Sequence, residues 1–227
     1  MQEKPFKTST PPSMTILIDN MPLDAKAAQI CDAIANDGYA ITEQFLPPLT
    51  VNALASEARQ LQLAGRMQRA STGKTNRLPN EEIRGDLTHW VEGSEASNPQ
   101  REYLSRMENL RTELNKSLFL GLFELESHFA IYPPGAFYRK HLDQFQGYKQ
   151  RQISCILYLN ENWQAEDGGQ LRLYLDGVAP EPYQDIKPVA GTLVTFLSGR
   201  FFHEVLPAQR ERISLTGWFR TRSDQPV

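Results

Sequence analysis

The stretch FYRKHLD, residues 137–143, carries a histidine and an aspartate two positions apart. On an extended strand, side chains with this spacing point to the same face. A second histidine, His203, follows sixty residues after Asp143. Two histidines and one carboxylate are the ligand set of non-heme Fe(II) sites, which leave the opposite face of the ion open for substrate and dioxygen. The sequence therefore predicts an iron site at His141, Asp143 and His203, and these three are the candidate catalytic residues.

Arg212, nine residues after His203, is a candidate anchor for an organic anion beside this metal. Its planar guanidinium can bind a carboxylate through two parallel hydrogen bonds, as a 2-oxoglutarate co-substrate would require. The alternative explanation of the His-x-Asp pair is an ordinary solvated surface pair. The chain has only four histidines, and two of them complete the pattern. This spacing favours the metal site.

Composition indicates one ordinary globular domain. A chain of 227 residues can bury one sizeable core, and its net charge of -3 gives no general attraction for nucleic acid or membranes. Cys31 and Cys155 are expected to be buried free thiols, which suits a reducing compartment. No apolar run is long enough to cross a bilayer. We therefore expect a cytoplasmic protein with no nucleic-acid or membrane partner.

The first half of the chain is expected to be mainly helical. An Ala-rich run predicts a helix over Leu23–Asn36, after a flexible segment at 1–22, and a short strand is expected over Tyr39–Phe45. Thr50 is the expected cap of a second helix. That helix should bury one face and end near a glycine, at Leu54, Ala58, Leu61 and Gly65. A third helix should begin at Asn98 and present one apolar stripe: Tyr103, Met107, Leu110, Leu114 and Leu118.

From about residue 123 the pattern changes to short strands separated by Gly and Pro turns. The expected strands are Phe129–Tyr132, Phe137–His141, Gln152–Asn160, Gln170–Leu175, Thr192–Leu197, His203–Leu206 and Arg212–Thr221. Many short strands indicate a sandwich or jelly roll. The predicted fold is therefore α+β and mostly β: a sandwich or jelly roll supported by N-terminal helices. We expect a single domain over 23–221 and a tail at 222–227.

Strand alternation predicts which side chains share a face. Ile156 should lie beside Tyr158, and Arg212 beside Ser214, Thr216 and Trp218. Tyr158 taken alone is better explained as an ordinary half-buried strand tyrosine. The polar segment from Arg66 to Glu82 has no predicted secondary structure, and a mobile active-site lid is favoured there over a disordered insertion.

Several motifs together resemble one known family. They occur in family order across roughly residues 83–219 and read IRGDLTHWVEG (83–93), YRKHLD (138–143), RQISCILYLN (151–160), GGQLR (168–172), HEV (203–205) and RISLTGWF (212–219). The chain is similar to the hypoxia-inducible-factor prolyl hydroxylases, which are 2-oxoglutarate-dependent iron oxygenases, and it looks like a compact bacterial member. The resemblance implies that the fold is a double-stranded β-helix (jelly roll). It also implies an enzyme that hydroxylates C4 of a prolyl residue in an exposed loop of a protein substrate. Dioxygen would be consumed, and succinate and carbon dioxide released.

The resemblance also implies roles for individual residues. Fe(II) would be held by His141, Asp143 and His203, with ascorbate as a candidate reductant. The distal carboxylate of 2-oxoglutarate would be bound by Arg212 and Tyr158. Cofactor-binding positions carried over from the family are Arg212, Tyr158, Tyr132, Thr216 and Trp218. Substrate-binding positions are Arg84, Asp86, Arg151 and Trp218, with Asp86 expected to pair with Arg151 at the base of a substrate loop.

Two other functions remain open from the sequence. One is a 2-oxoglutarate oxygenase that acts on a free amino acid or another side chain, for which a deep closed pocket would speak. The other is a non-catalytic metal-dependent module for binding or oxygen sensing. Retention of His141, Asp143, His203 and Arg212 favours an enzyme over the second alternative.

Overall fold

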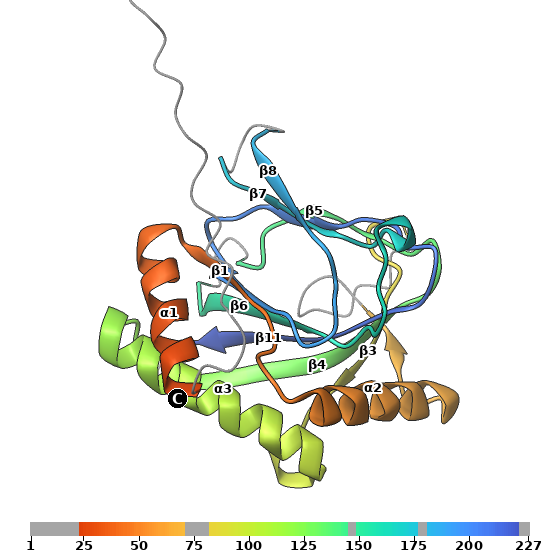
Figure 1. Ribbon diagram of the computed structural model, residues 1–227, viewed down its shortest axis with the longest axis horizontal. Helices are drawn as coiled ribbons and strands as arrows, with labels where there is room; N and C mark the ends of the chain where they lie inside the picture. The colour runs from red at the N-terminus through yellow and green to blue at the C-terminus, as the bar shows by residue number, and fades with distance from the viewer. Residues whose placement is uncertain (1–22, 71–81, 145–148, 177–180, 223–227) are drawn as a thin grey trace, which may run out of the picture.

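The computed structural model describes residues 23–70, 82–144, 149–176 and 181–222 (Figure 1). Two antiparallel sheets face each other, and three helices lie together on the outer side of the larger sheet. The predicted flexible segment 1–22 and tail residues 223–227 fall outside the described residues. Within the described ranges, no helix is long and apolar enough to span a membrane.

The larger sheet has seven strands. Their spatial order is β1 (Tyr39–Thr42), β9 (Leu193–Leu197), β6 (Arg151–Tyr158), β11 (Arg212–Arg220), β4 (Glu124–Tyr132), β3 (Leu87–Trp90) and β2 (Gln68–Arg69). The longest pairing joins β11 to β4 along nine residues. The order brings strands from both halves of the chain into one layer.

The smaller sheet has four strands. Their order is β5 (Tyr138–His141), β10 (His203–Val205), β7 (Leu171–Tyr174) and β8 (Tyr183–Ile186). All neighbouring strands in both sheets pair antiparallel. This arrangement confirms the predicted jelly roll.

The three helices agree with the apolar patterns. They are α1 (Leu23–Asn36), α2 (Pro48–Leu63) and α3 (Asn98–Leu118), with short 3-10 turns at Gly93–Glu95 and Ala165–Asp167. In α3 the Ser97 side chain caps the first turn by accepting a hydrogen bond from the Gln100 backbone N–H. The predicted cap of α2 was wrong, because two prolines start that helix and Thr50 lies within it, donating to Glu102 at 2.6 Å.

Two apolar cores separate the layers. The first lies between the helices and the larger sheet and contains the α3 stripe together with Cys31 and Cys155, both free thiols as predicted. The second lies between the two sheets and contains Ile156 and Tyr158. On β11, alternate residues such as Leu215 belong to the helix-side core. The predicted face shared by Arg212, Ser214 and Thr216 is therefore the inner face of the jelly roll.

Strands β2, β3 and β8 were not predicted. Each spans only two to four residues, too few for alternation to reveal it. β3 forms because it pairs with the edge of β4, and β2 then pairs with β3. Consequently the start of the Arg66–Glu82 segment is ordered, and the predicted lid concerns residues 71–81, which lie outside the described part of the chain.

The helix-side core should dominate stability. We expect Leu110→Ala, at a site that is 1% exposed, to lower the free energy of unfolding by about 2–5 kcal/mol, because it leaves a cavity between α3 and the sheet. Chemical denaturation measures this. The matched control is Leu63→Ala on α2, where the side chain is 87% exposed and the change should be within about 0.5 kcal/mol. Equal losses in the two variants would contradict the packing described here.

Candidate metal centre

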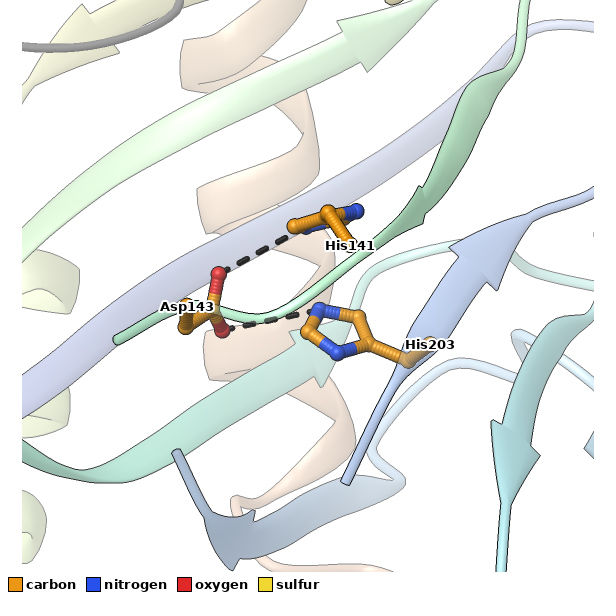
Figure 2. A group of neighbouring side chains, drawn as sticks. All are labelled: His141, Asp143 and His203. Atoms are coloured by element: carbon orange, nitrogen blue, oxygen red, sulfur yellow. Dashed lines mark ion pairs between the residues drawn. The ribbon is translucent and has the colours of Figure 1, made fainter. Parts of the chain in front are cut away.

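The two candidate histidine ligands come from adjacent strands. His141 ends β5 and His203 begins β10, and the two are direct partners in the antiparallel register. Their ring centroids lie 4.2 Å apart. Asp143 follows two residues after β5 and turns its carboxylate toward both rings (Figure 2). One ligand atom from each of the three residues lies within 4.8 Å of the others.

Backbone carbonyls set the protonation of both rings. The Nδ1 atom of His141 lies 2.7 Å from the Arg139 carbonyl oxygen, and the Nδ1 atom of His203 lies 3.2 Å from that of Phe201. A carbonyl only accepts, so in the neutral form of each ring Nδ1 carries the proton and Nε2 keeps a lone pair. Each Nε2 is 3.5 Å from one oxygen of Asp143. With both rings neutral, three electron-pair donors converge on one place, an arrangement that fits a divalent cation.

Electrostatics keep these groups in their ligating forms. Burial opposes ionisation of Asp143, but the adjacent His203 and His141 rings and the Ser154 hydroxyl outweigh it and hold its pKa well below the usual range. Burial and the nearby His141 lower the pKa of His203 to about 4. At neutral pH the site therefore presents one carboxylate and a neutral imidazole at His203, as metal binding requires.

A second polar site lies on the inner face of the larger sheet. Arg212 is 1% exposed and its Nε donates to the Gly169 carbonyl at 2.9 Å. Its guanidinium carbon lies 5.1 Å from the ring centroids of both Tyr132 and Tyr158. Among the described residues, neither Nη2 of Arg212 nor the Tyr158 hydroxyl has a hydrogen-bond partner. Burying a cation this way is costly, so the site fits an anionic ligand.

Thr216 and Trp218 continue along β11 from Arg212 on the same strand. The Thr216 hydroxyl lies 3.3 Å from that of Ser214. The Trp218 ring is stacked under the Arg151 guanidinium at 3.6 Å, and its indole N–H is buried without a partner in the described structure. These two predicted residues therefore lie on the same inner face as the anion site.

The predicted ion pair between Asp86 and Arg151 was wrong. Asp86 instead accepts two hydrogen bonds from Arg84, at 2.8 and 2.6 Å, and Arg151 pairs with Glu126 at 2.7 Å. Arg84 and Asp86 are two residues apart in extended backbone, so their side chains lie on the same face and can pair with each other. Glu126 reaches Arg151 across β11, a contact that depends on the order of strands in the sheet.

Arg84 and Asp86 lie behind a metal ligand. The Arg84 guanidinium stacks on the Tyr138 ring at 4.3 Å, and that ring stacks on His141 at 3.6 Å. The backbone beside Arg84 also hydrogen-bonds to β5, because the Arg139 backbone N–H donates to the Ile83 carbonyl at 2.9 Å. The pair thus supports the strand that carries His141.

Sequence reasoning missed three side chains on the inner face: Tyr138, Ser154 and His128. Ser154 donates to Asp143 at 2.7 Å, and alternation from Ile156 could have found it. His128 lies between two indole rings, with centroids 5.0 Å from Trp90 and 5.5 Å from Trp218. Alternation from Tyr132 along β4 would have placed it there.

A jelly roll with two histidines and one carboxylate at a shared site has the architecture of a non-heme Fe(II) oxygenase. Comparison with known proteins agrees. Residues 127–220 match the 2OG-Fe(II) oxygenase superfamily model. A Pseudomonas putida prolyl-4-hydroxylase is similar with a TM-score of 0.78 and 48% identity, covering 87% of this chain and all of that one.

Animal relatives are more distant. Egl nine homolog 1 from Homo sapiens is 32% identical over 80% of this chain, which spans only 43% of that protein's length. A prolyl hydroxylase from Trichoplax adhaerens, solved with a hypoxia-inducible-factor peptide, is 26% identical with a TM-score of 0.78, covering 87% of this chain and 90% of that one. The chain belongs to the prolyl hydroxylase family of 2OG-Fe(II) oxygenases, a superfamily that needs Fe(II) and 2-oxoglutarate.

His128 should make the stability of the metal-free protein sensitive to acid. Burial lowers its pKa to about 4, below the value of about 6.5 expected in the unfolded chain. Between these two pKa values the unfolded state binds more protons than the folded state. The contribution of neutral His128 to the free energy of unfolding is therefore complete above pH 6.5 and is lost as the pH falls toward 4. Between pH 6.5 and 4 we expect the parent protein to lose about 3 kcal/mol more of its free energy of unfolding than the His128→Phe variant loses.

Chemical unfolding at several pH values between 7 and 4, without metal, measures the effect. Asp143 and His203 titrate in both proteins, so the difference between the two profiles reports His128. Parallel profiles would show that His128 is not buried in its neutral form.

Proposed function

We propose that this protein hydroxylates a prolyl residue of a protein substrate, using Fe(II), 2-oxoglutarate and dioxygen. The observation that carries the proposal is the placement of two complementary sites inside one jelly roll. One is the convergent set His141, Asp143 and His203, and the other is the buried cation Arg212 with unpartnered donor groups. Similarity to prolyl hydroxylases supports the substrate class.

Each group has a defined task in this proposal. His141, Asp143 and His203 hold the iron, which supplies the oxidising chemistry when it is bound with 2-oxoglutarate and dioxygen. Arg212 and Tyr158 bind the distal carboxylate of 2-oxoglutarate through charge-assisted hydrogen bonds. Burial raises the pKa of Tyr158 to about 12, which keeps its hydroxyl a donor at neutral pH. Tyr132 and Thr216 line the same site.

The polypeptide is proposed to bind over Trp218 and Arg151. Arg151 is held over the indole by Glu126, so its position is fixed before substrate arrives. Trp90 adjoins this surface and is 50% exposed. By contrast, Asp86 is 1% exposed and fully engaged with Arg84, so we propose that this pair positions β5 and makes no direct contact with substrate.

Two further aspects of the proposal concern the cell. The buried free thiols Cys31 and Cys155 support a reducing, cytoplasmic location.

Because dioxygen is a substrate, we also propose that the rate of turnover depends on the oxygen concentration and that the protein can act as an oxygen sensor. Measuring turnover against dissolved oxygen tests this, since a rate already saturated at low oxygen would rule out sensing.

Loss of the carboxylate ligand should abolish turnover. We expect Asp143→Ala to reduce 2-oxoglutarate consumption by about 100-fold or more, because the iron loses one of three protein ligands and its open positions are misdirected. Succinate release measures this under matched iron and oxygen. The control is Asp185→Ala, which should leave the rate unchanged. Asp185 lies on β8 and pairs with Arg172 of β7 at the surface. If Asp143→Ala consumes 2-oxoglutarate at nearly the parental rate, Asp143 is not an iron ligand.

The anion site should depend on guanidinium geometry as well as charge. We expect Arg212→Lys to weaken 2-oxoglutarate binding by about 100-fold and Tyr158→Phe by about 10-fold, since hydrogen bonds to charged groups contribute about 1.5–3 kcal/mol each. Titration of the iron-loaded enzyme measures both. Tyr183→Phe on the edge strand β8 is the control. Unchanged co-substrate affinity in Arg212→Lys would place 2-oxoglutarate elsewhere.

The substrate class is tested by mass spectrometry. The enzyme is incubated with iron, 2-oxoglutarate and either a host lysate or proline-containing peptides, and the prolyl residues are searched for a gain of one oxygen atom. Hydroxylated prolyl residues are expected in protein loops. If only a free amino acid is hydroxylated, the protein is a small-molecule oxygenase. If 2-oxoglutarate is consumed without any hydroxylated product, a sensing or binding module is favoured.

A further inference from the structure

We propose that Ser154 and Ser198 form a buried hydroxyl relay that positions the Asp143 carboxylate for metal binding. Ser154 donates to Oδ2 of Asp143 at 2.7 Å, and its oxygen lies 2.8 Å from the Ser198 hydroxyl. This inference rests on the metal site and not on the identity of the substrate. Ser154 and Ser198 are therefore positioning residues that act through Asp143.

Asp143 needs such support because strand pairing does not hold it. β5 ends at His141, so Asp143 lies beyond the last paired residue of the smaller sheet. Its carboxylate reaches toward the larger sheet, where Ser154 lies on the inner face of β6. The hydroxyl thus joins a metal ligand on one sheet to a strand of the opposite sheet. This contact sets the direction of the carboxylate relative to both histidines.

The direction of the hydrogen bonds follows from donor counting. An ionised carboxylate only accepts, and a serine hydroxyl has a single proton to donate. Ser154 gives its proton to Asp143, so the proton between the two serines must come from Ser198. The relay therefore runs from Ser198 through Ser154 to Asp143. It binds Oδ2 and makes the two oxygens of Asp143 chemically distinct.

Burial makes this relay necessary. Ser154 and Ser198 are both 0% exposed, so bulk water cannot replace either hydroxyl. The backbone of Ser198 is also held, because its N–H donates to the Gln152 carbonyl at 2.9 Å. Loss of a hydrogen bond that orients a metal-ligating side chain commonly weakens metal affinity by about 10- to 100-fold. The relay should accordingly be measurable in metal binding itself.

The test is Co(II) affinity of the full-length chain, measured by competition with a chelator in the absence of 2-oxoglutarate and peptide. We expect Ser154→Ala to bind Co(II) about 10- to 100-fold more weakly. Ser154→Thr, which keeps the hydroxyl and suits a strand, should retain affinity within about threefold. Ser198→Ala should lose about threefold to tenfold, because Ser154 keeps its donor but loses the partner that orients it.

Two controls separate positioning from general loss of structure. Thr195→Val removes a fully buried hydroxyl from the helix side of neighbouring β9, and Leu110→Ala destabilises the distant core. Both should bind Co(II) like the parent. Parental affinity in Ser154→Ala, equal weakness in Ser154→Thr, or equal weakness in Leu110→Ala would overturn the relay.

If Ser154→Ala does not fold, Ser198→Ala decides the question, and unchanged affinity in that variant would overturn the proposal. The outcome is independent of the proposed reaction. Co(II) affinity requires no prolyl substrate, so failure to hydroxylate any peptide would leave the relay standing, and loss of the relay would leave prolyl hydroxylation untouched as a proposal.

Discussion

Three electron-pair donors face one another where the two sheets meet, and the rest of the structure supports that arrangement. The Nδ1 atoms of His141 and His203 face backbone carbonyls, so the Nε2 lone pairs of the neutral rings lie on the side of the Asp143 carboxylate. Two rigid sheets hold them close enough for one ion, with the smaller sheet providing the histidines and the larger sheet supporting the aspartate through Ser154.

The larger sheet carries the complementary charge. Arg212 is buried between Tyr132 and Tyr158 on the inner face, with hydrogen-bonding capacity that the described protein groups do not use. The smaller sheet therefore carries candidate metal ligands and the larger sheet carries a candidate anion site. A co-substrate that binds iron at one end and Arg212 at the other would connect the two sheets. Their separation thus determines the length of ligand that fits.

Local periodicity explains what could be predicted. The α3 stripe around Met107 and the shared face of Arg212 and Thr216 follow from the repeat of a helix and a strand, which depend only on backbone geometry. Failures occurred where the partner is distant. The acid that pairs with Arg151 is Glu126 rather than Asp86, and β3 exists because β4 offers an edge. Neither fact is present in a local pattern.

By itself, the sequence determined the candidate metal ligands, the candidate anion anchor and a strand-rich second half backed by helices, because these depend on residue type, spacing and alternation. Tertiary structure decided which carbonyls orient the histidines, which hydroxyl holds Asp143, and why Arg84 stacks behind His141 through Tyr138. The physical reason is strand register. A side chain in a sheet contacts partners on other strands, and those partners depend on how segments that are distant in the sequence align. That alignment is fixed by burial of the apolar face of every strand at once.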